Sequence, residues 1–305
     1  MSTSTTKVTA HTVEVNGYTF SYRESGQGQG EPLVLLHGHI SDQRAWDELE
    51  PRLATRFHVY NYSRRFAWPN RPIRDDERCP WEQDALDLAG LIETWGISPV
   101  HVLANSSGAV ISLYTAKTRP QLFRTLMVEE PPLVGLFLPS LPPSLPSLLS
   151  FLVWHPITFW PVMHFATTTT GPVIALCKEG NYHEAIDTFC SGVINARYWP
   201  RLQRNPDRKR QVEDNAKWLC QFFRYSAVPK YGPEDAQRLK VPALVMAGKE
   251  STAHQRYTAA ELYMVLGSGR KRIAYIDDAA HLMHEDNPQR VFDEVVSFVF
   301  EDAAK

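Results

Sequence analysis

The sequence predicts an α/β protein with a mostly parallel, doubly wound sheet and an inserted helical lid, or cap. Short β-rich runs alternate with longer runs of helical periodicity in the first part of the chain and again near its end. Such alternation requires crossover connections, which favour a parallel sheet with helices on both faces. Between the two parts lies a long segment, rich in proline, that fits neither pattern. The chain of 305 residues is long enough for one large domain of this kind.

The first strands are expected to form an antiparallel hairpin. The stretch "HTVEVNGYTFSYRES" contains two alternating runs joined at Asn16-Gly17, a pair typical of a two-residue hairpin turn. A polar, glycine-rich loop then leads to the apolar run "PLVLLHG" at 32–38, and the β-rich run "FHVYNYS" occupies 57–63. Both runs are predicted to be strands.

The remaining elements follow the same two periodicities. The run "WEQDALDLAGLIETWG" places apolar residues at helical spacing and stops at Gly96, a residue that commonly ends helices. Further strands are predicted at 100–104, 123–130, 241–248 and 272–278, and further helices at 107–118, about 257–267 and about 288–301.

The segment between the two parts is predicted to be a lid. No Asp, Glu, Lys or Arg occurs between Glu130 and Lys178. Prolines interrupt this stretch every few residues, so a membrane-spanning helix of about 18 residues does not fit, and no stable membrane insertion is expected. We expect short helices instead. The chain then divides into a first core part (1–130), a helical lid (131–238) and a second core part (239–305).

Composition and charge favour a small-molecule partner. The formal net charge of −2 gives no electrostatic basis for binding nucleic acid. The opening "MSTSTTKVTA" has no basic segment followed by an apolar one, so a secretory signal is not expected. Four cysteines, Cys79, Cys177, Cys190 and Cys220, lack CxxC spacing, which favours free thiols in a reducing compartment. We expect a cytoplasmic protein, and a homo-oligomer is compatible with these features.

The stretch "VHVLANSSGAVISLYTAK" passes from a strand directly into a helix, with Ser106 at the corner. A serine hydroxyl becomes a strong nucleophile when a base takes its proton and hydrogen-bond donors stabilise the oxyanion that forms. A sharp strand-to-helix turn exposes the serine, but it requires small residues two positions before and after it. Ala104 and Gly108 meet this requirement. Ser107 is a poorer candidate nucleophile, because Asn105 would then have to be the small residue.

Three motifs occur in order along the chain: "VLLHGHISDQRAW", "ANSSGA" and "IDDAAHLMHEDNP". Together they resemble the α/β-hydrolase superfamily, in its serine-nucleophile branch with a lid domain, over nearly the whole chain. The resemblance implies the α/β-hydrolase fold with Ser106 as nucleophile. It also implies His281 as the base, with His284 as a rival. The oxyanion hole would use the backbone N–H groups of Ser107 and His39.

The acid that orients the histidine has two candidate positions. Most members of the superfamily place an Asp after the strand that here ends "LVMAG", but Ser251 stands there and Glu250 precedes it. Other members place the acid after the preceding strand, where Glu130 comes directly before a proline. Fungal zearalenone lactonases are similar in this feature. We predict Glu130 as the acid, with Glu250 as the alternative, and expect Glu129 to point to the opposite side.

The residue types in the predicted lid indicate the polarity of the substrate. Residues 133–164 carry bulky apolar side chains and no charge, and Trp154, Trp160 and Trp199 are candidates to line the substrate pocket. These features favour a lipophilic carboxylic ester or lactone, cleaved through an acyl-enzyme by a Ser-His-Glu triad, with no metal or organic cofactor implied. Two alternatives remain open. The same residues could serve a lyase, acyltransferase or cyclase of natural-product metabolism, or the fold could bind a small molecule without catalysis.

Overall fold

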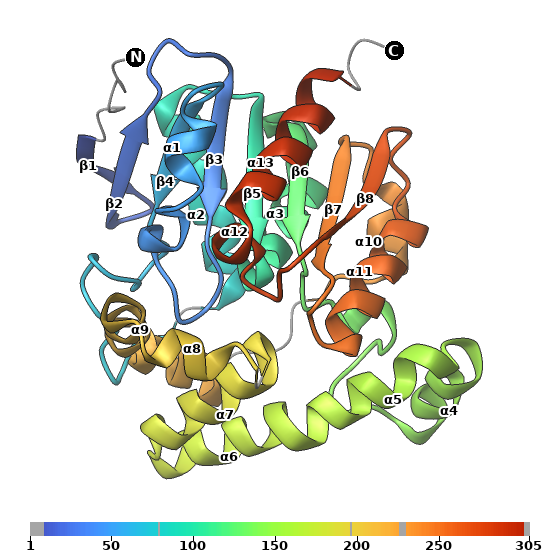
Figure 1. Ribbon diagram of the computed structural model, residues 1–305. Coiled ribbons are helices and arrows are strands. Elements are labelled where there is room, and N and C mark those ends of the chain that lie inside the picture. The colour runs from blue at the N-terminus through green and yellow to red at the C-terminus, as the bar shows by residue number, and fades with distance from the viewer. Residues whose placement is uncertain (1–8, 79, 196, 226–229, 302–305) are drawn as a thin grey trace.

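The sheet of this protein has eight strands in the order β1-β2-β4-β3-β5-β6-β7-β8 (Figure 1). The structure is a computed structural model that describes residues 9–78, 80–195, 197–225 and 230–301; Cys79 lies outside these residues. β1 pairs antiparallel with β2, and β2 with β4, whereas all later neighbours pair in parallel. The predicted mostly parallel sheet is therefore confirmed. The strands are β1 (Thr9–Val15), β2 (Tyr18–Ser25), β3 (Pro32–Leu36), β4 (His58–Tyr62), β5 (Val100–Asn105), β6 (Phe123–Glu129), β7 (Ala243–Gly248) and β8 (Lys271–Ile276).

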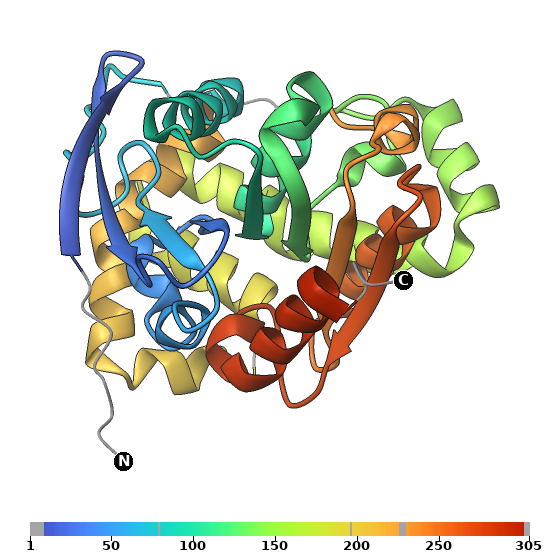
Figure 2. The same cartoon turned by 90° about the horizontal axis from the view of Figure 1, so that it is seen from above.

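Helices connect the strands as the sequence predicts, and Figure 2 shows them on both faces of the sheet. The α-helices are α1 (Glu50–Leu53), α2 (Trp81–Trp95), α3 (Ser106–Thr118), α4 (Leu145–Trp154), α5 (Pro156–Phe165), α6 (Gly171–Glu179), α7 (Tyr182–Ile194), α8 (Trp199–Gln203), α9 (Pro206–Tyr225), α10 (Pro233–Arg238), α11 (Ala253–Val265), α12 (Met283–Asp286) and α13 (Pro288–Val296). Short 3-10 helices are η1 (Gln43–Trp46), η2 (Pro120–Leu122) and η3 (Val134–Leu136), and π-helical turns are η4 (Ala166–Thr170) and η5 (Ser297–Glu301).

The hairpin between β1 and β2 turns at the predicted place. Val15 pairs with Tyr18, so that Asn16 and Gly17 alone form the turn. Both have positive φ angles, 51° and 68°, the left-handed conformation that this two-residue turn requires and that asparagine and glycine tolerate best.

The central strands are buried on both faces because their side chains alternate between two apolar layers. On β3, Val34 and Leu36 face a layer that includes side chains of α2, α3 and α11. Leu33 and Leu35 face the other layer, which includes side chains of α1 and α13. The parallel strands therefore read as continuous apolar runs in the sequence, and their carboxyl ends meet at one edge of the sheet.

The helices α4 to α9 lie between β6 and β7 in the sequence. Figure 1 shows them as a layer below the carboxyl ends of the strands. α10, at the end of this segment, packs instead on the sheet domain, where Asp235 forms an ion pair with Lys117 of α3 (2.9 Å). Among the described residues, no helix combines the length and apolar character that crossing a membrane requires.

Candidate active site

Ser106 lies at the junction of β5 and α3, with no connecting loop between the two elements. Its φ angle is 52°, a left-handed conformation that costs a non-glycine residue roughly 1–3 kcal/mol. Strain of this kind is characteristic of the sharp turn that presents a nucleophile. Because α3 begins at Ser106, the backbone N–H of Ser107 falls in the first turn of the helix, where it has no acceptor within the helix.

Two glycines permit the close packing around this turn. A Cβ atom on Gly108 would lie 2.5 Å from the carbonyl oxygen of His37, so any larger residue would push α3 away from the end of β3. A Cβ atom on Gly38 would lie 3.1 Å from the Cβ of Ser106. The loop that begins "HGH" therefore lies directly against the serine, as the small-residue pattern requires.

His281 and Glu130 meet at the carboxyl edge of the sheet. Nδ1 of His281 lies 2.7 Å from Oε2 of Glu130, and both side chains are buried. The other carboxylate oxygen, Oε1, accepts a hydrogen bond from the backbone N–H of Gly248 (2.9 Å). Glu130 itself has a φ angle of 42°, so it shares with Ser106 the left-handed conformation found at functional sites. The carboxylate is thus fixed at both oxygens.

A second histidine–glutamate pair lies beside the first. Nδ1 of His284 lies 2.6 Å from Oε2 of Glu129, and both side chains are fully buried. Asn105 joins the two pairs: its Nδ2 donates to Glu129 Oε2 and to the backbone carbonyl of His281 (both 3.1 Å). Glu129, the last residue of β6, and Glu130, which follows it, thus contact different histidines.

The side chain of Glu250, the alternative acid, contacts Arg197, whereas the carboxylate that contacts His281 is that of Glu130. The carboxylate of Glu250 forms an ion pair with Arg197 (2.9 Å), and its side chain is 38% exposed. Its backbone carbonyl accepts a hydrogen bond from Asn195 (2.8 Å). The geometry therefore brings His281 together with Glu130 and engages Glu250 elsewhere.

One cavity opens beside Ser106 and His281, and both residues line it. Its volume is about 50 Å³, room for only a few water molecules, whereas ligand pockets usually measure about 300–1,000 Å³. A sizeable ligand therefore needs the covering helices to move. The covering wall is largely apolar and comes from α7, α8 and α9: Phe189, Cys190, Val193, Ile194, Trp199, Leu202 and Val212.

The predicted pocket tryptophans divide between two places. Trp199 is 7% exposed and lines the cavity. Trp154 and Trp160 are 77% and 67% exposed and do not line it, so their expected place in the pocket is wrong. The apolar wall comes mainly from α7 and α8 instead. The spacing of Phe189, Cys190, Val193 and Ile194 at three and four residues could have identified that wall in the sequence.

His39 stands at the cavity between the sheet and α9. Its ring packs on Phe222 (4.3 Å between ring centroids) and Trp218 (5.2 Å). Burial, and then the charge of Arg64, lower the pKa of His39 well below its ordinary value, so the imidazole is neutral. His37 is neutral for the same two reasons, with its pKa lowered to about 3, which suits its acceptance of the Arg64 backbone N–H (2.9 Å).

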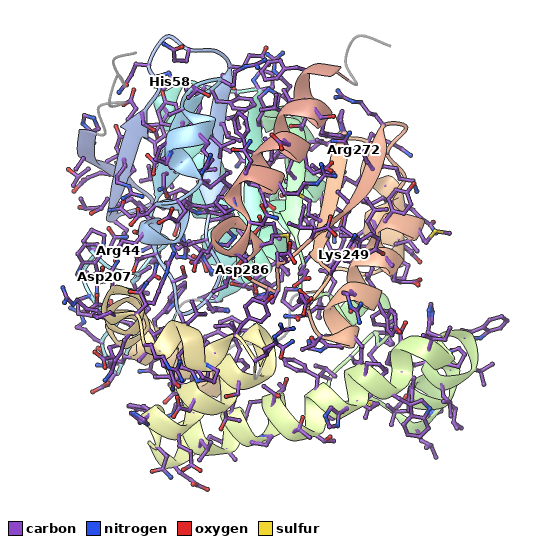
Figure 3. All side chains as sticks on the ribbon, in the orientation of Figure 1. Arg44, His58, Asp207, Lys249, Arg272 and Asp286 are labelled. Atoms are coloured by element: carbon purple, nitrogen blue, oxygen red, sulfur yellow. The ribbon has the colours of Figure 1, made fainter. Side chains whose placement is uncertain are left out.

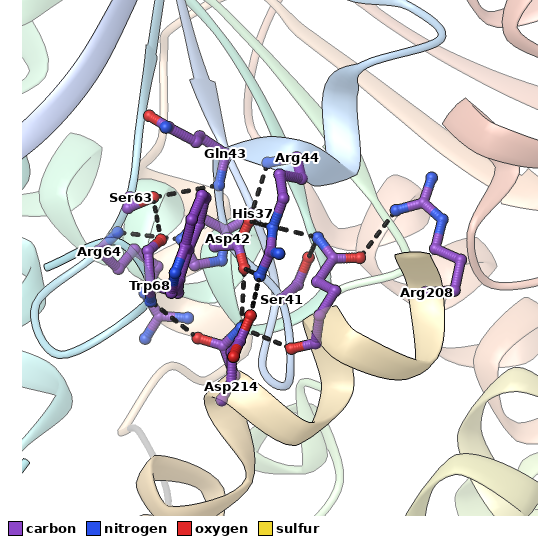
Figure 4. A network of polar contacts seen from close by, with 12 residues as sticks. His37, Ser41, Asp42, Gln43, Arg44, Ser63, Arg64, Trp68, Arg208 and Asp214 are labelled. Atoms are coloured by element: carbon purple, nitrogen blue, oxygen red, sulfur yellow. Dashed lines mark hydrogen bonds and ion pairs between the residues drawn. The ribbon is translucent and has the colours of Figure 1, made fainter. Parts of the chain in front are cut away.

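A polar network attaches α9 to the loop that carries His39 (Figure 4). The buried carboxylate of Asp42 accepts hydrogen bonds from Asn215 of α9 (2.8 Å) and from Arg44 (2.7 Å). Arg44 also forms an ion pair with Asp214 of α9 (2.8 Å). Figure 3 places Arg44 at this boundary between the sheet and the helical layer. The position of α9 thus bears directly on the loop beside the serine.

The other side of the cavity carries a charged pair. Arg208 of α9 lies 2.9 Å from Glu285 of α12, and both residues line the cavity. Burial raises the pKa of Glu285 to about 7, against the opposing effect of Arg208. Asp286, labelled in Figure 3, accepts the backbone N–H of Ala280 (2.9 Å) and so fixes the loop just before His281.

Comparison with known proteins agrees with this architecture. The family model described as "Alpha/beta hydrolase family" matches residues 33–294, and the chain belongs to this family of hydrolases. The predicted α/β-hydrolase fold is confirmed. A probable esterase of Oryza sativa subsp. japonica is 30% identical over 108 residues, which are 35% of this chain and 40% of that protein.

Two further similarities are informative. Karrikin insensitive 2 receptor B of Petunia hybrida is 32% identical over 104 residues, 33% of this chain and 38% of that protein. These matches thus span about two fifths of the curated relatives. The crystal structure of a carboxylesterase from Bacillus subtilis has a TM-score of 0.70 and covers 97% of this chain and 92% of its own, at 16% identity. At that identity the likeness shows the fold alone.

Proposed function

We propose that this protein is a serine hydrolase that cleaves a lipophilic carboxylic ester or lactone. The observation that carries the proposal is the hydrogen bond of 2.7 Å between His281 and Glu130, at a cavity lined by both His281 and Ser106. The left-handed conformation of Ser106 supports its role as nucleophile. Residues 131–238 act as the lid in this proposal, because α7 to α9 cover the cavity.

The reaction has two halves. Ser106 Oγ attacks the substrate carbonyl while Nε2 of His281 takes its proton, and the Glu130 carboxylate stabilises the imidazolium that forms. The tetrahedral oxyanion accepts hydrogen bonds from the backbone N–H groups of Ser107 and His39. Collapse expels the alkoxide, which receives the proton from His281. Water, activated by the same histidine, then attacks the acyl-enzyme and releases the carboxylic acid. With a lactone, the acid and the alcohol leave as one hydroxy acid.

The cavity supports an uncharged, lipophilic substrate. Most of its covering wall is aliphatic or aromatic, and its charged pair, Arg208 and Glu285, is already mutually engaged. Apolar walls with few polar groups favour ligands of matching polarity. The free, buried thiols of Cys177, Cys190 and Cys220 support the proposed cytoplasmic location, because such thiols persist in reducing compartments.

A fluorophosphonate probe tests this proposal, because it forms a covalent adduct with activated serines. We expect an adduct on Ser106, located by peptide mass mapping, that disappears in Ser106→Ala and in His281→Ala. Ser107→Ala is the matched control and should keep the adduct. An adduct on Ser107, or labelling that survives His281→Ala, would contradict the assignment. Esters and lactones of increasing chain length would then define the substrate.

A small-molecule receptor is the second candidate function, because one of the curated relatives carries the name of a receptor. A receptor would bind its ligand without needing turnover. The Ser106→Ala variant distinguishes the two functions. A receptor with this substitution keeps its ligand affinity and its downstream output, whereas a hydrolase still binds its substrate but no longer forms product.

A further inference from the structure

The pair of helices α4 and α5 carries an apolar outer face. Large apolar side chains point into solvent along it: Leu145, Leu149, Val153, Trp154, Ile157 and Trp160. Monomeric soluble proteins seldom expose contiguous apolar patches of this kind unless the patch has a function. Figures 1 and 2 show α4 and α5 at one end of the helical layer, projecting beyond the sheet. We call these six side chains the apolar face.

The apolar face is a fixed feature of the helix pair. Three of its α4 members recur every four residues at Leu145, Leu149 and Val153, so these three share one side of the helix, and Trp154 ends α4 directly after them. The opposite side is held by an internal aromatic cluster. Phe151 is buried and packs on Phe137 (4.8 Å between centroids) and on Phe159 of α5 (5.2 Å). Because the inward sides are already occupied, the outward residues cannot turn inward without unpacking this cluster.

The segment that carries the apolar face has no Asp, Glu, Lys or Arg from residue 131 to residue 177, so insertion of the six side chains of the apolar face into an apolar phase would desolvate none of these charges. His155, between α4 and α5, contacts Glu261 of α11 (3.5 Å). A protein partner usually meets an apolar patch through a polar rim with directional hydrogen bonds, whereas the six side chains of the apolar face carry no polar group other than the indole N–H of each tryptophan. A lipid surface requires no such directional contacts. Tryptophan side chains, here Trp154 and Trp160, are also enriched at membrane–water interfaces.

We propose that the apolar face docks the protein on the surface of an uncharged phospholipid bilayer, with α4 and α5 lying in the interface. Because no cation contributes, binding depends on buried apolar area rather than on anionic lipid. The docked segment is continuous with the part of the lid that covers the cavity: α5 leads through η4 into α6, and α6 packs on α7, which lines the cavity. This inference deepens the proposed function, on which it rests, by naming a membrane-dissolved substrate as the class that reaches Ser106.

Co-sedimentation of the full chain with phosphatidylcholine vesicles tests this inference. We expect the wild-type protein to bind, with little change when salt is raised or anionic lipid is added. Trp154→Ser/Trp160→Ser should weaken binding about tenfold or more, because each lost tryptophan removes a large apolar contribution. The matched control is Leu86→Ser/Met264→Ser, which removes two exposed apolar residues from α2 and α11. It should bind like the wild type.

Three results would overturn the docking proposal. These are absence of vesicle binding, binding only to anionic vesicles, and equal weakening by the control variant. A concentration-dependent dimer that the tryptophan variant abolishes, without vesicle binding, would assign the face to a second copy of the chain. Probe labelling of Ser106 in the tryptophan variant separates the two proposals. If the tryptophan variant is labelled normally but no longer binds vesicles, the proposal of a serine hydrolase stands. If the wild type binds vesicles but is not labelled, only the proposal of a serine hydrolase is overturned.

Discussion

The two histidine–glutamate pairs have nearly the same internal geometry and very different surroundings. Each joins a glutamate at the end of β6 to a histidine beyond β8, with Nδ1–Oε2 distances of 2.7 Å for His281–Glu130 and 2.6 Å for His284–Glu129. His281 lines the cavity. His284 lies against the indole of Trp46, with ring centroids 4.3 Å apart, and does not line the cavity.

Both histidines pair with a glutamate, so the pairing alone does not identify the catalytic base. The two differ in whether the ring borders the cavity beside Ser106. Burial opposes the charge on His284, but the Glu129 carboxylate outweighs it and raises the pKa of the ring. His284 is therefore engaged with Glu129 within the core. His281 instead stands where a nucleophile and a substrate can reach its second nitrogen. Each of the following predictions tests whether the two pairs differ in this way.

The largest effect is expected for Glu130→Gln. Loss of the carboxylate removes the group that orients and stabilises the imidazolium, which in a comparable triad lowers kcat about 10⁴-fold. We expect kcat/KM on a short soluble ester to fall about 10³-fold or more, together with the rate of probe labelling. Glu250→Gln is the matched control and should remain within about threefold of the wild type. Loss of activity only in Glu250→Gln would reverse the assignment of the acid.

Glu129→Gln should affect stability rather than chemistry. Without this carboxylate, burial disfavours the charged form of His284, so the variant loses a buried hydrogen bond of the kind that typically contributes about 1.5–3 kcal/mol. We expect the free energy of unfolding, measured with urea, to fall by about 2 kcal/mol, while labelling of Ser106 stays within about tenfold. Glu213→Gln, on the exposed side of α9, should change neither quantity. Abolished labelling at full stability would make the second pair the catalytic one.

Glu285 lies 3.9 Å from His284, so the pH dependence of the free energy of unfolding tests the environment of the His284–Glu129 pair. The pKa of Glu285 is raised from 4.5 to about 7, so between these values the folded protein binds more protons than the unfolded chain. The free energy of unfolding therefore contains a contribution that is full below pH 4.5 and is lost as pH rises toward 7. That contribution is about 3 kcal/mol.

Glu285→Gln should remove this contribution. The difference in unfolding free energy between wild type and variant should change by about 3 kcal/mol between pH 4.5 and pH 7.5. Urea unfolding at several pH values measures it. His37, with a pKa of about 3, makes the protein less stable as pH falls. Because wild type and variant both contain His37, this trend cancels when their unfolding free energies are subtracted. A difference that does not vary with pH would show that folding does not raise the pKa of Glu285.

The sequence predicted the sheet domain better than the lid, for a physical reason. In the sheet, apolar periodicity and turn chemistry point to the same structure, as at Asn16-Gly17 and at the strand-to-helix turn of Ser106. Alternation along a strand separated Glu130 from Glu129 in the prediction, and the two glutamates do contact different histidines. In the lid, an apolar run shows that side chains avoid water, but not which element covers them. Trp154 and Trp160 were therefore assigned to the pocket, although they lie on the outer surface.

Asn105 offers the smallest and most selective test, because it is the residue that donates to both pairs. Asn105→Ala removes two hydrogen bonds, so it should lower the free energy of unfolding by about 1–2 kcal/mol, at a usual net value of roughly 0.5–1 kcal/mol each, and kcat only a few-fold. Combined with Glu129→Gln, it forms a double-mutant cycle. A coupling of about 0.5 kcal/mol or more, measured in kcat as well as in stability, would mean that the buried pair positions the loop of His281 through Asn105. Strict additivity would make the two pairs independent, and the second pair would then contribute to the fold without any influence on the site beside it.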